Sequence, residues 1–347
     1  MKPSPTIREI AAHLGLSIYS VSMALRGSER VAPTTRARIV ASALELGYRP
    51  NPTIAALMSS MRSKKLTRHL TTMALVIPVN EPQWNGRHRY IVDIVEGVRE
   101  RCNALGFGYE QFVMQPDQAG WETLNQVIES RGIDGLILGP QYDTVGAHGI
   151  DLSRLAYVAI GLTFKETPAH RVTTTTLANI RQALEHTLAL GWNRPGIIIT
   201  DRDNDSVENI MLGAYLGYLH RRIERAPAPL IYKEKDFNAE NVIAWMRREG
   251  VNAILCSREI VSTWLRDAGV RVGTDVAFAL LDRPRGPSEL AGIVQRLHEV
   301  GGTSVDLLGE LIHANERGLA KIPRVIEVEG EWVDGPSMPP CPHYPRR

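Results

Sequence analysis

The chain has 347 residues, of which 44% are hydrophobic, and its formal net charge is only +2. This length predicts two or three domains with a large buried core, and no run of about 18 apolar residues offers a membrane-spanning helix. The three cysteines (Cys102, Cys256 and Cys341) are too few and too scattered for a disulfide framework or a metal site.

The chain opens with two short helical segments joined by a tight turn. An amphipathic segment at 6–13 begins at Thr6, and Glu9 three residues later completes a capping box. Leu14-Gly15-Leu16 is the turn, and Ser17 can cap the segment that follows. This pattern predicts a helix-turn-helix, whose second helix fits the major groove of DNA.

The second segment leaves large side chains on its outer face. Ile18, Tyr19, Ser22 and Met23 lie on or near that face, whereas the inner face is formed by Val21, Ala24 and Leu25. A solvated helix rarely exposes such side chains together, which indicates that a partner covers them. A third helix is predicted from Thr34 or Thr35 to Gly47, and its expected core face is listed here: Ile39, Val40, Ala43, Leu44 and Leu46.

The spacing of these residues resembles the LacI/GalR (lactose-repressor) family of bacterial transcription regulators. The matching positions are Thr6-Ile7, Ile10-Ala11, Gly15-Leu16-Ser17, Val21-Ser22, Leu25, Gly27, Val31, Thr35-Arg36, Gly47-Tyr48 and Pro50-Asn51. The alternative is a small core-forming three-helix bundle of some other protein. The resemblance implies a transcriptional regulator, typically a repressor, that binds a palindromic operator in double-stranded DNA as a homodimer.

The resemblance also implies which residues contact DNA. We expect them to be Thr6, Ile7, Ser17, Ile18, Tyr19, Ser20, Ser22, Met23, Arg30, Thr34, Thr35, Asn51, Ala55 and Leu57. Met23 departs from the family, which often carries an arginine there for bidentate contact with guanine.

Residues 51–71 are interpreted as a hinge helix and linker. The resemblance implies that the hinge folds only on DNA, where Leu57 would wedge into the minor groove. The alternative is a disordered linker with accidental helical spacing. Residues 1–68 contain 11 lysines and arginines against 3 acidic residues, so a basic head precedes an acidic body, as expected of a head that meets phosphate.

From residue 72 onward, short apolar runs alternate with amphipathic segments, which predicts an α/β fold with parallel sheets and helices on both faces. Strands are predicted at 73–78, 107–114, 133–139, 157–161, 195–199, 230–232, 253–256 and 276–281. Helices are predicted at 90–105, 121–131, 177–190, 207–222, 239–248, 259–267 and 301–315. The family resemblance implies a two-lobed, periplasmic-binding-protein-like body that binds an effector and dimerises.

The expected domains follow from these elements. They are a helix-turn-helix domain at 1–50, the hinge and linker at 51–71, a two-lobed body at 72–330 and a disordered, proline-rich tail at 331–347. The first lobe is placed at about 72–162 and 278–305, and the second at about 163–277 and 306–330.

A small polar effector, such as a sugar or a sugar derivative, is expected in the cleft between the lobes, beyond the carboxyl ends of the strands. By position, the candidate effector-binding residues are Tyr90, Gln141, Thr163, Phe164, Asn209, Arg258, Glu259 and Asp282. The alternative for each is an ordinary polar or loop residue. Several positions where sugar-responsive relatives carry polar groups are changed, including Ile210 in place of an arginine. Two explanations remain open. Either the effector is not a typical monosaccharide, or the chain has lost its response to an effector.

Two other classes of protein remain as alternatives. An enzyme with a DNA-binding head is disfavoured because the chain has no phosphate-binding loop, nucleophile elbow or metalloprotease motif. An exported solute-binding protein would share the body, but residues 1–5 lack the apolar region of a signal peptide. We therefore expect a cytoplasmic, nucleoid-associated protein that is not an enzyme and needs no cofactor or metal.

Overall fold

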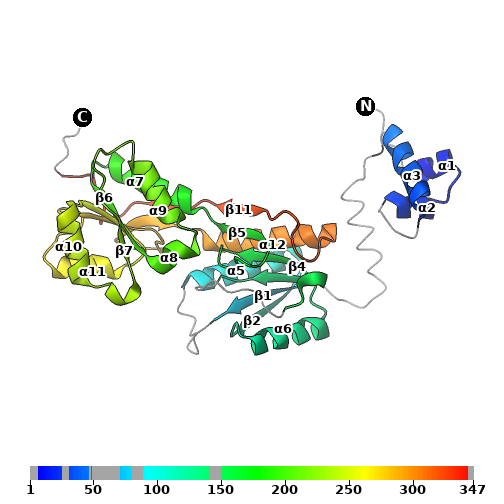
Figure 1. The fold of residues 1–347 in the computed structure, drawn as a ribbon, viewed down its shortest axis with the longest axis horizontal. Helices are drawn as coiled ribbons and strands as arrows, with labels where there is room; N and C mark the ends of the chain where they lie inside the picture. The colour runs from blue at the N-terminus through cyan, green and yellow to red at the C-terminus, as the bar shows by residue number, and fades with distance from the viewer. Residues whose placement is uncertain are drawn as a thin grey trace. The chain divides into compact units, whose positions relative to one another are not determined.

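The computed structural model describes residues 7–25, 31–46, 48, 71–79, 89–140 and 150–342. The chain divides into two compact units, a head at 1–69 and a body at 70–347, which are described separately (Figure 1). No helix in the described ranges is long and apolar enough to cross a membrane.

The head contains the predicted helix-turn-helix. Its described helices are α1 (Ile7–Leu14), α2 (Ile18–Leu25) and α3 (Pro33–Glu45). They bury a small apolar core made of Ile10, Ala11, Val21, Ala24, Ile39 and Ala43. The wider core face predicted for α3 is wrong, because Val40, Leu44 and Leu46 are exposed. The buried residues of α3 are Ile39, Ser42 and Ala43, and the i, i+4 pair Ile39 and Ala43 supplies its apolar contacts with the other two helices.

The first sheet of the body is entirely parallel and has the strand order β11-β5-β4-β3-β1-β2. The strands are β1 (Thr72–Pro78), β2 (Gly108–Met114), β3 (Gly135–Leu138), β4 (Ala156–Ile160), β5 (His170–Thr174) and β11 (Val325–Val328). Helices α5 (Arg89–Leu105) and α12 (Leu297–Ala314) cover one face, and α6 (Gln118–Arg131) covers the other (Figure 1). A short 3-10 turn, Leu152–Arg154, precedes β4.

The second sheet has the order β12-β10-β9-β8-β6-β7 and is parallel apart from β12. The strands are β6 (Pro195–Thr200), β7 (Leu230–Tyr232), β8 (Ala253–Cys256), β9 (Ala277–Leu280), β10 (Ala291–Val294) and β12 (Glu331–Val333). Helices α7 (Thr176–Ala189) and α9 (Ile210–Leu219) cover one face; α10 (Ala239–Glu249) and α11 (Ile260–Asp267) cover the other. The short helix α8 (Asp201–Ser206) follows β6, and a 3-10 turn, Glu234–Asp236, follows β7.

The two sheets confirm the α/β class and the two lobes, but the predicted lobe boundaries differ from the sheet membership. Strands β9 and β10 belong to the second sheet rather than the first, and β5 and β11 belong to the first. Helix α12 packs on α5 and on the first sheet. The first lobe is therefore 72–174 with 297–328, and the second is 176–294 with 331–342. Local periodicity cannot show which sheet a strand will join, since that depends on distant partners.

The predicted disordered tail is wrong for residues 331–342. Strand β12 pairs with β10, and Met338 is only 3% exposed within the second lobe. The indole Nε1 of Trp192 donates a hydrogen bond to the carbonyl of Pro339 at 2.7 Å. The proline-rich composition suggested disorder, but the β12–β10 pairing, the burial of Met338 and the Trp192–Pro339 hydrogen bond hold this segment in place. Residues 343–347 lie outside the described part of the chain.

Helices α5 and α12 approach each other at glycines. A Cβ atom on Gly97 of α5 would overlap the backbone carbonyl of His298 in α12. Likewise, a Cβ on Gly301 of α12 would overlap the carbonyl of Ile94. The two backbones are therefore in direct contact, which only glycine permits.

Candidate nucleic-acid interface and ligand pocket

In the head, Ser17 caps the N-terminus of α2. The backbone N–H of Ser20 donates to Ser17 Oγ at 3.0 Å, and the two hydroxyls lie 2.8 Å apart. This is the predicted N-cap, which stabilises the first turn of a short helix. Ser17 is exposed, so the same end of the helix is open to a phosphate.

The outer face of α2 exposes two large side chains. Ile18 is 48% exposed and Tyr19 is 66% exposed, whereas Val21 and Ala24 are buried in the core of the head. Helix α2 has no charged residue. Any reading of bases by this helix must therefore use apolar contacts and hydroxyl groups.

The other predicted DNA contacts fall into two groups. Thr34 is exposed, and Ile7, Ser20, Ser22, Met23 and Thr35 are half-buried. Thr6, Arg30, Asn51, Ala55 and Leu57, with the whole hinge, lie outside the described residues.

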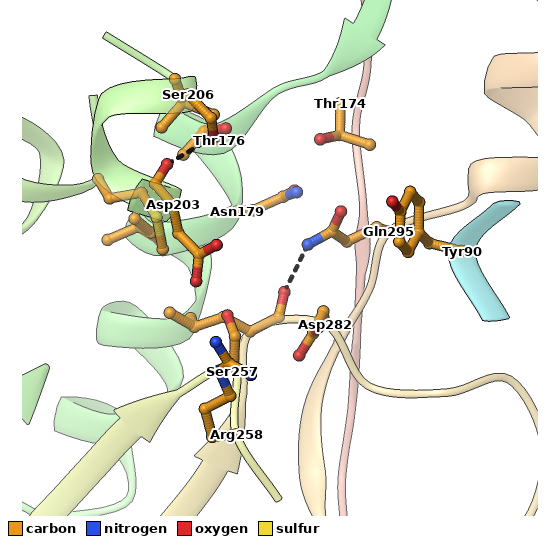
Figure 2. A pocket seen from close by; sticks show the side chains of 14 residues that line it. Tyr90, Thr174, Thr176, Asn179, Asp203, Ser206, Ser257, Arg258, Asp282 and Gln295 are labelled. Atoms are coloured by element: carbon orange, nitrogen blue, oxygen red, sulfur yellow. Dashed lines mark hydrogen bonds between the residues drawn. The ribbon is translucent and has the colours of Figure 1, made fainter. Parts of the chain in front are cut away.

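The body contains a pocket of about 330 Å³. Figure 2 shows its polar lining, which comes from both lobes. Tyr90 of α5 and Thr174 at the end of β5 belong to the first lobe; the second lobe supplies Thr176, Asn179, Ile180, Asp203, Ser206, Val207, Met211, Ser257, Arg258, Leu281, Asp282 and Gln295. Several of these residues follow the carboxyl ends of parallel strands, where α/β sheets bind ligands.

Charged side chains gather on the second-lobe side of the pocket. Asp203 lies in α8, Arg258 follows β8 and Asp282 follows β9. Arg258 Nη2 donates to Glu234 Oε2 at 2.9 Å, so its charge is already matched. Desolvation by the pocket walls and then the Asp203 carboxylate raise the pKa of Asp282 to about 7, although Asp282 is an exposed residue that the solvent in the pocket reaches.

Asn179 presents a buried donor to the pocket. Its side chain is 5% exposed, and its Oδ1 accepts a hydrogen bond from Gly330 N at 2.9 Å. This bond fixes the amide plane, and Figure 2 shows the Nδ2 end directed into the pocket between Thr174 and Gln295. The bond to Gly330 occupies Oδ1 and leaves Nδ2 open to the pocket.

Comparison with known proteins finds relatives both for the head and for most of the chain. Residues 6–51 match the family described as "Bacterial regulatory proteins, lacI family". The regulator CelR of Thermobifida fusca is 27% identical over 80% of this chain and 82% of its own. The lactose operon repressor of Escherichia coli K12 is 24% identical over 90% of this chain and 85% of its own.

The chain belongs to the LacI family. It is a DNA-binding transcriptional regulator of that family, and the curated relatives described above are regulators rather than enzymes. Solved structures agree in fold: a CelR–cellobiose complex has a TM-score of 0.59 at 22% identity, covering 96% of this chain and 99% of the other. A lac repressor dimer bound to operator and the anti-inducer ONPF also has a TM-score of 0.59, at 17% identity, covering 97% of this chain and 100% of the other.

Some of the effector candidates predicted in this LacI-family chain come together, and others do not. Tyr90, Arg258 and Asp282 line one pocket. Phe164 is fully buried in the same core cluster as Trp121, and Thr163 beside it is 6% exposed; neither lines the pocket. Gln141 lies outside the described residues.

Asn209 and Glu259 also lie off the pocket lining. The helix predicted at 207–222 is interrupted, because Glu208 and Asn209 have positive φ angles and α9 starts only at Ile210. Asn209 Oδ1 instead accepts a hydrogen bond from Asn204 Nδ2 at 2.6 Å. Glu259 is exposed at the start of α11. Both predictions assumed that a polar residue near a strand end faces the cleft.

Asn179, Asp203 and Gln295 line the pocket but were not predicted from the sequence. Asp203 could have been found, because it follows a predicted strand at 195–199, where the rule for α/β sheets places ligand contacts. Gln295 follows β10, a strand that the sequence analysis did not predict. The side-chain amide of Asn179 is oriented by its hydrogen bond with Gly330, which is 151 residues away.

Replacing Ser17 by alanine should destabilise the head by about 1 kcal/mol, because the cap of α2 is lost. DNA affinity should fall alike for all sequences, since Ser17 is expected to hold phosphate. Ser17→Asp is the matched variant: a carboxylate keeps the cap but repels phosphate, so stability returns while DNA affinity does not. Thermal unfolding and fluorescence anisotropy on two unrelated duplexes measure both effects. A sequence-dependent loss would contradict this role.

Asp282 should make the stability of the body depend on pH. Its pKa of about 7 in the folded state lies above the ordinary value near 4. The folded state therefore holds the proton through this interval while the unfolded state has lost it, so stability falls as pH rises from about 4 to 7 and stays lower above. Solvent in the pocket screens the effect, so Asp282→Asn should stabilise the body by about 1–2 kcal/mol at pH 8.

The same substitution should change little at pH 4.5, where the folded wild-type side chain is already neutral. Denaturant unfolding at both pH values measures the difference. Asp205→Asn, an exposed position on α8 outside the pocket lining, is the control. An equal effect of Asp282→Asn at the two pH values would contradict the prediction.

Proposed function

We propose that this LacI-family regulator is a repressor that binds a palindromic operator as a homodimer. The observation that carries the proposal is the outer face of α2, where Ile18 and Tyr19 are exposed beside a capped helix end. One eight-residue helix reads only a few base pairs, and two-fold pairing of subunits supplies the rest of the site. Such a protein works on nucleoid DNA in the cytoplasm.

The pocket in the body is the proposed effector site. Its lining joins Tyr90 and Thr174 of the first lobe to Asn179, Asp203 and Asp282 of the second. A ligand that contacts both sides favours one spacing of the lobes over another, and in this way changes DNA affinity by its differential binding. The cellobiose complex of CelR supports a small polyhydroxylated effector.

Selection of bound duplexes from a random library with the full chain tests this function. We expect an inverted repeat whose two halves are separated by about one helical turn, bound by two chains. A single unrepeated motif bound by one chain would contradict the dimeric part. Recovery of random sequences would contradict the regulator itself.

A further inference from the structure

The pocket has a negative net charge, because the one cation among its described lining residues forms an ion pair with a glutamate outside the lining. Two of its three charged lining residues are the carboxylic acids Asp203 and Asp282. The third, Arg258, pairs with Glu234. An anionic ligand would meet two carboxylates and a guanidinium that is already matched. A ligand with a positive charge would relieve the repulsion between Asp203 and Asp282.

A second observation, independent of charge, supports a ligand in this pocket. The amide nitrogen of Asn179 is held in the buried wall by the Oδ1–Gly330 hydrogen bond and is directed into the open space (Figure 2). This donor is open to the pocket, so an acceptor on a ligand can bind it in place of water. The site therefore offers one fixed donor as well as its carboxylate acceptors.

The rest of the lining suits a hydroxylated ligand. Thr174, Thr176, Ser206 and Ser257 bring hydroxyl groups, and Gln295 is fixed by a hydrogen bond from its Nε2 to Leu281 O at 3.0 Å. Tyr90 adds an aromatic ring from the first lobe. Hydroxyls of a ligand can donate to carboxylates and accept from an amide, as this lining requires.

We propose that the effector is a small polyhydroxylated amine, such as an amino sugar, whose ammonium group binds at Asp203 and Asp282 and one of whose oxygens accepts from Asn179 Nδ2. This inference rests on the proposed effector role of the pocket and narrows it to one chemical class. The proposed class excludes neutral sugars and sugar phosphates as the effector of this chain.

The charge arrangement gives the amine a characteristic pH dependence. Asp282 faces Asp203 from α8, with Arg258 and Glu259 from the segment between β8 and α11. An ammonium group favours the ionised carboxylate, so its binding below pH 7 displaces a proton from Asp282. Amine affinity should therefore rise between pH 5.5 and 7.5, while a neutral sugar should gain nothing over the same interval.

Calorimetry on the full chain with matched ligand pairs tests the proposal. The pairs are glucosamine with glucose and the Tris cation with pentaerythritol, and glucose 6-phosphate is the anionic probe, all in a buffer free of amines. In each pair the amine should bind about tenfold tighter at pH 7.5. Asp203→Asn and Asp282→Asn should each abolish most of this preference, whereas Asp205→Asn should keep it. Binding of the neutral member shows that each variant is folded.

The outcomes distinguish this inference from the proposed function. Equal affinity within both pairs, or tightest binding of glucose 6-phosphate, overturns the amine and leaves the pocket an effector site. Silence of every probe at tens of millimolar overturns both the amine and the effector role. An amine preference that survives Asp203→Asn and Asp282→Asn also overturns the proposal, because the charge then acts elsewhere.

Discussion

Gly97→Ala is expected to destabilise the body by about 2–3 kcal/mol, lowering its unfolding temperature by roughly 5–10 °C. The added Cβ would overlap the carbonyl of His298, which is backbone in α12 and cannot rotate away. Alanine favours a helix over glycine by up to about 1 kcal/mol, and the expected loss of about 2–3 kcal/mol is the net value after this gain is subtracted from the cost of the overlap. Separation of α5 from α12 would loosen the core around Val98, Val300 and Leu308.

The matched control is Gly302→Ala in α12. A Cβ there has no neighbour closer than 3.8 Å, so alanine should be neutral or stabilising. Calorimetric unfolding of the full chain compares the two variants. A Gly97→Ala protein as stable as the Gly302→Ala protein would show that the helices do not meet at Gly97 as described.

Ile18→Ala and Tyr19→Ala are expected to change which half-site the regulator prefers, by about 1–3 kcal/mol per base position. Both side chains project from the uncharged outer face of α2, Ile18 at 48% and Tyr19 at 66% exposure. Ile18 can contact a thymine methyl group, and the Tyr19 hydroxyl can reach a base edge. Neither side chain belongs to the buried core of the head, so the head should remain folded.

Parallel binding-site selections with wild type and both variants measure the preference. Leu44→Ala is the control, because Leu44 is an apolar side chain of α3 that is 72% exposed and outside α2. The same selected motif from wild type, Ile18→Ala and Tyr19→Ala would refute the assignment of α2 as the base-reading helix.

The head was predictable because its determinants are local. The Ser17 cap, the Gly15 turn and the inward positions Val21 and Ala24 are fixed by spacings of a few residues, and the structure shows each of them. The alternating strands and helices of the body are local in the same sense. Local spacing did not identify every core residue correctly: Val40 and Leu44 were predicted to be buried but are exposed. An apolar residue one position away from the inner face of a helix cannot be told from a core residue by sequence alone.

The predictions that were wrong or missing concern residues whose structure depends on partners far away in the sequence. Strands β5, β10, β11 and β12 went unpredicted, and these lie beside the places where the chain passes between the lobes. The lobe boundaries were therefore misplaced. The lining of the pocket depends on a distant contact too, because Asn179 is oriented by Gly330. The ordered C-terminal segment depends on another, the hydrogen bond from Trp192 to Pro339. Neither contact leaves a short-range signal.

Competition between the selected duplex and a random duplex of equal length, at about 150 mM salt, measures whether the head reads base sequence. We expect the full chain to bind the selected duplex at least about 10³-fold more tightly, as specific regulators do. Salt should weaken both, because phosphate contacts contribute to each. Equal affinity for the two duplexes would contradict the claim that α2 reads sequence.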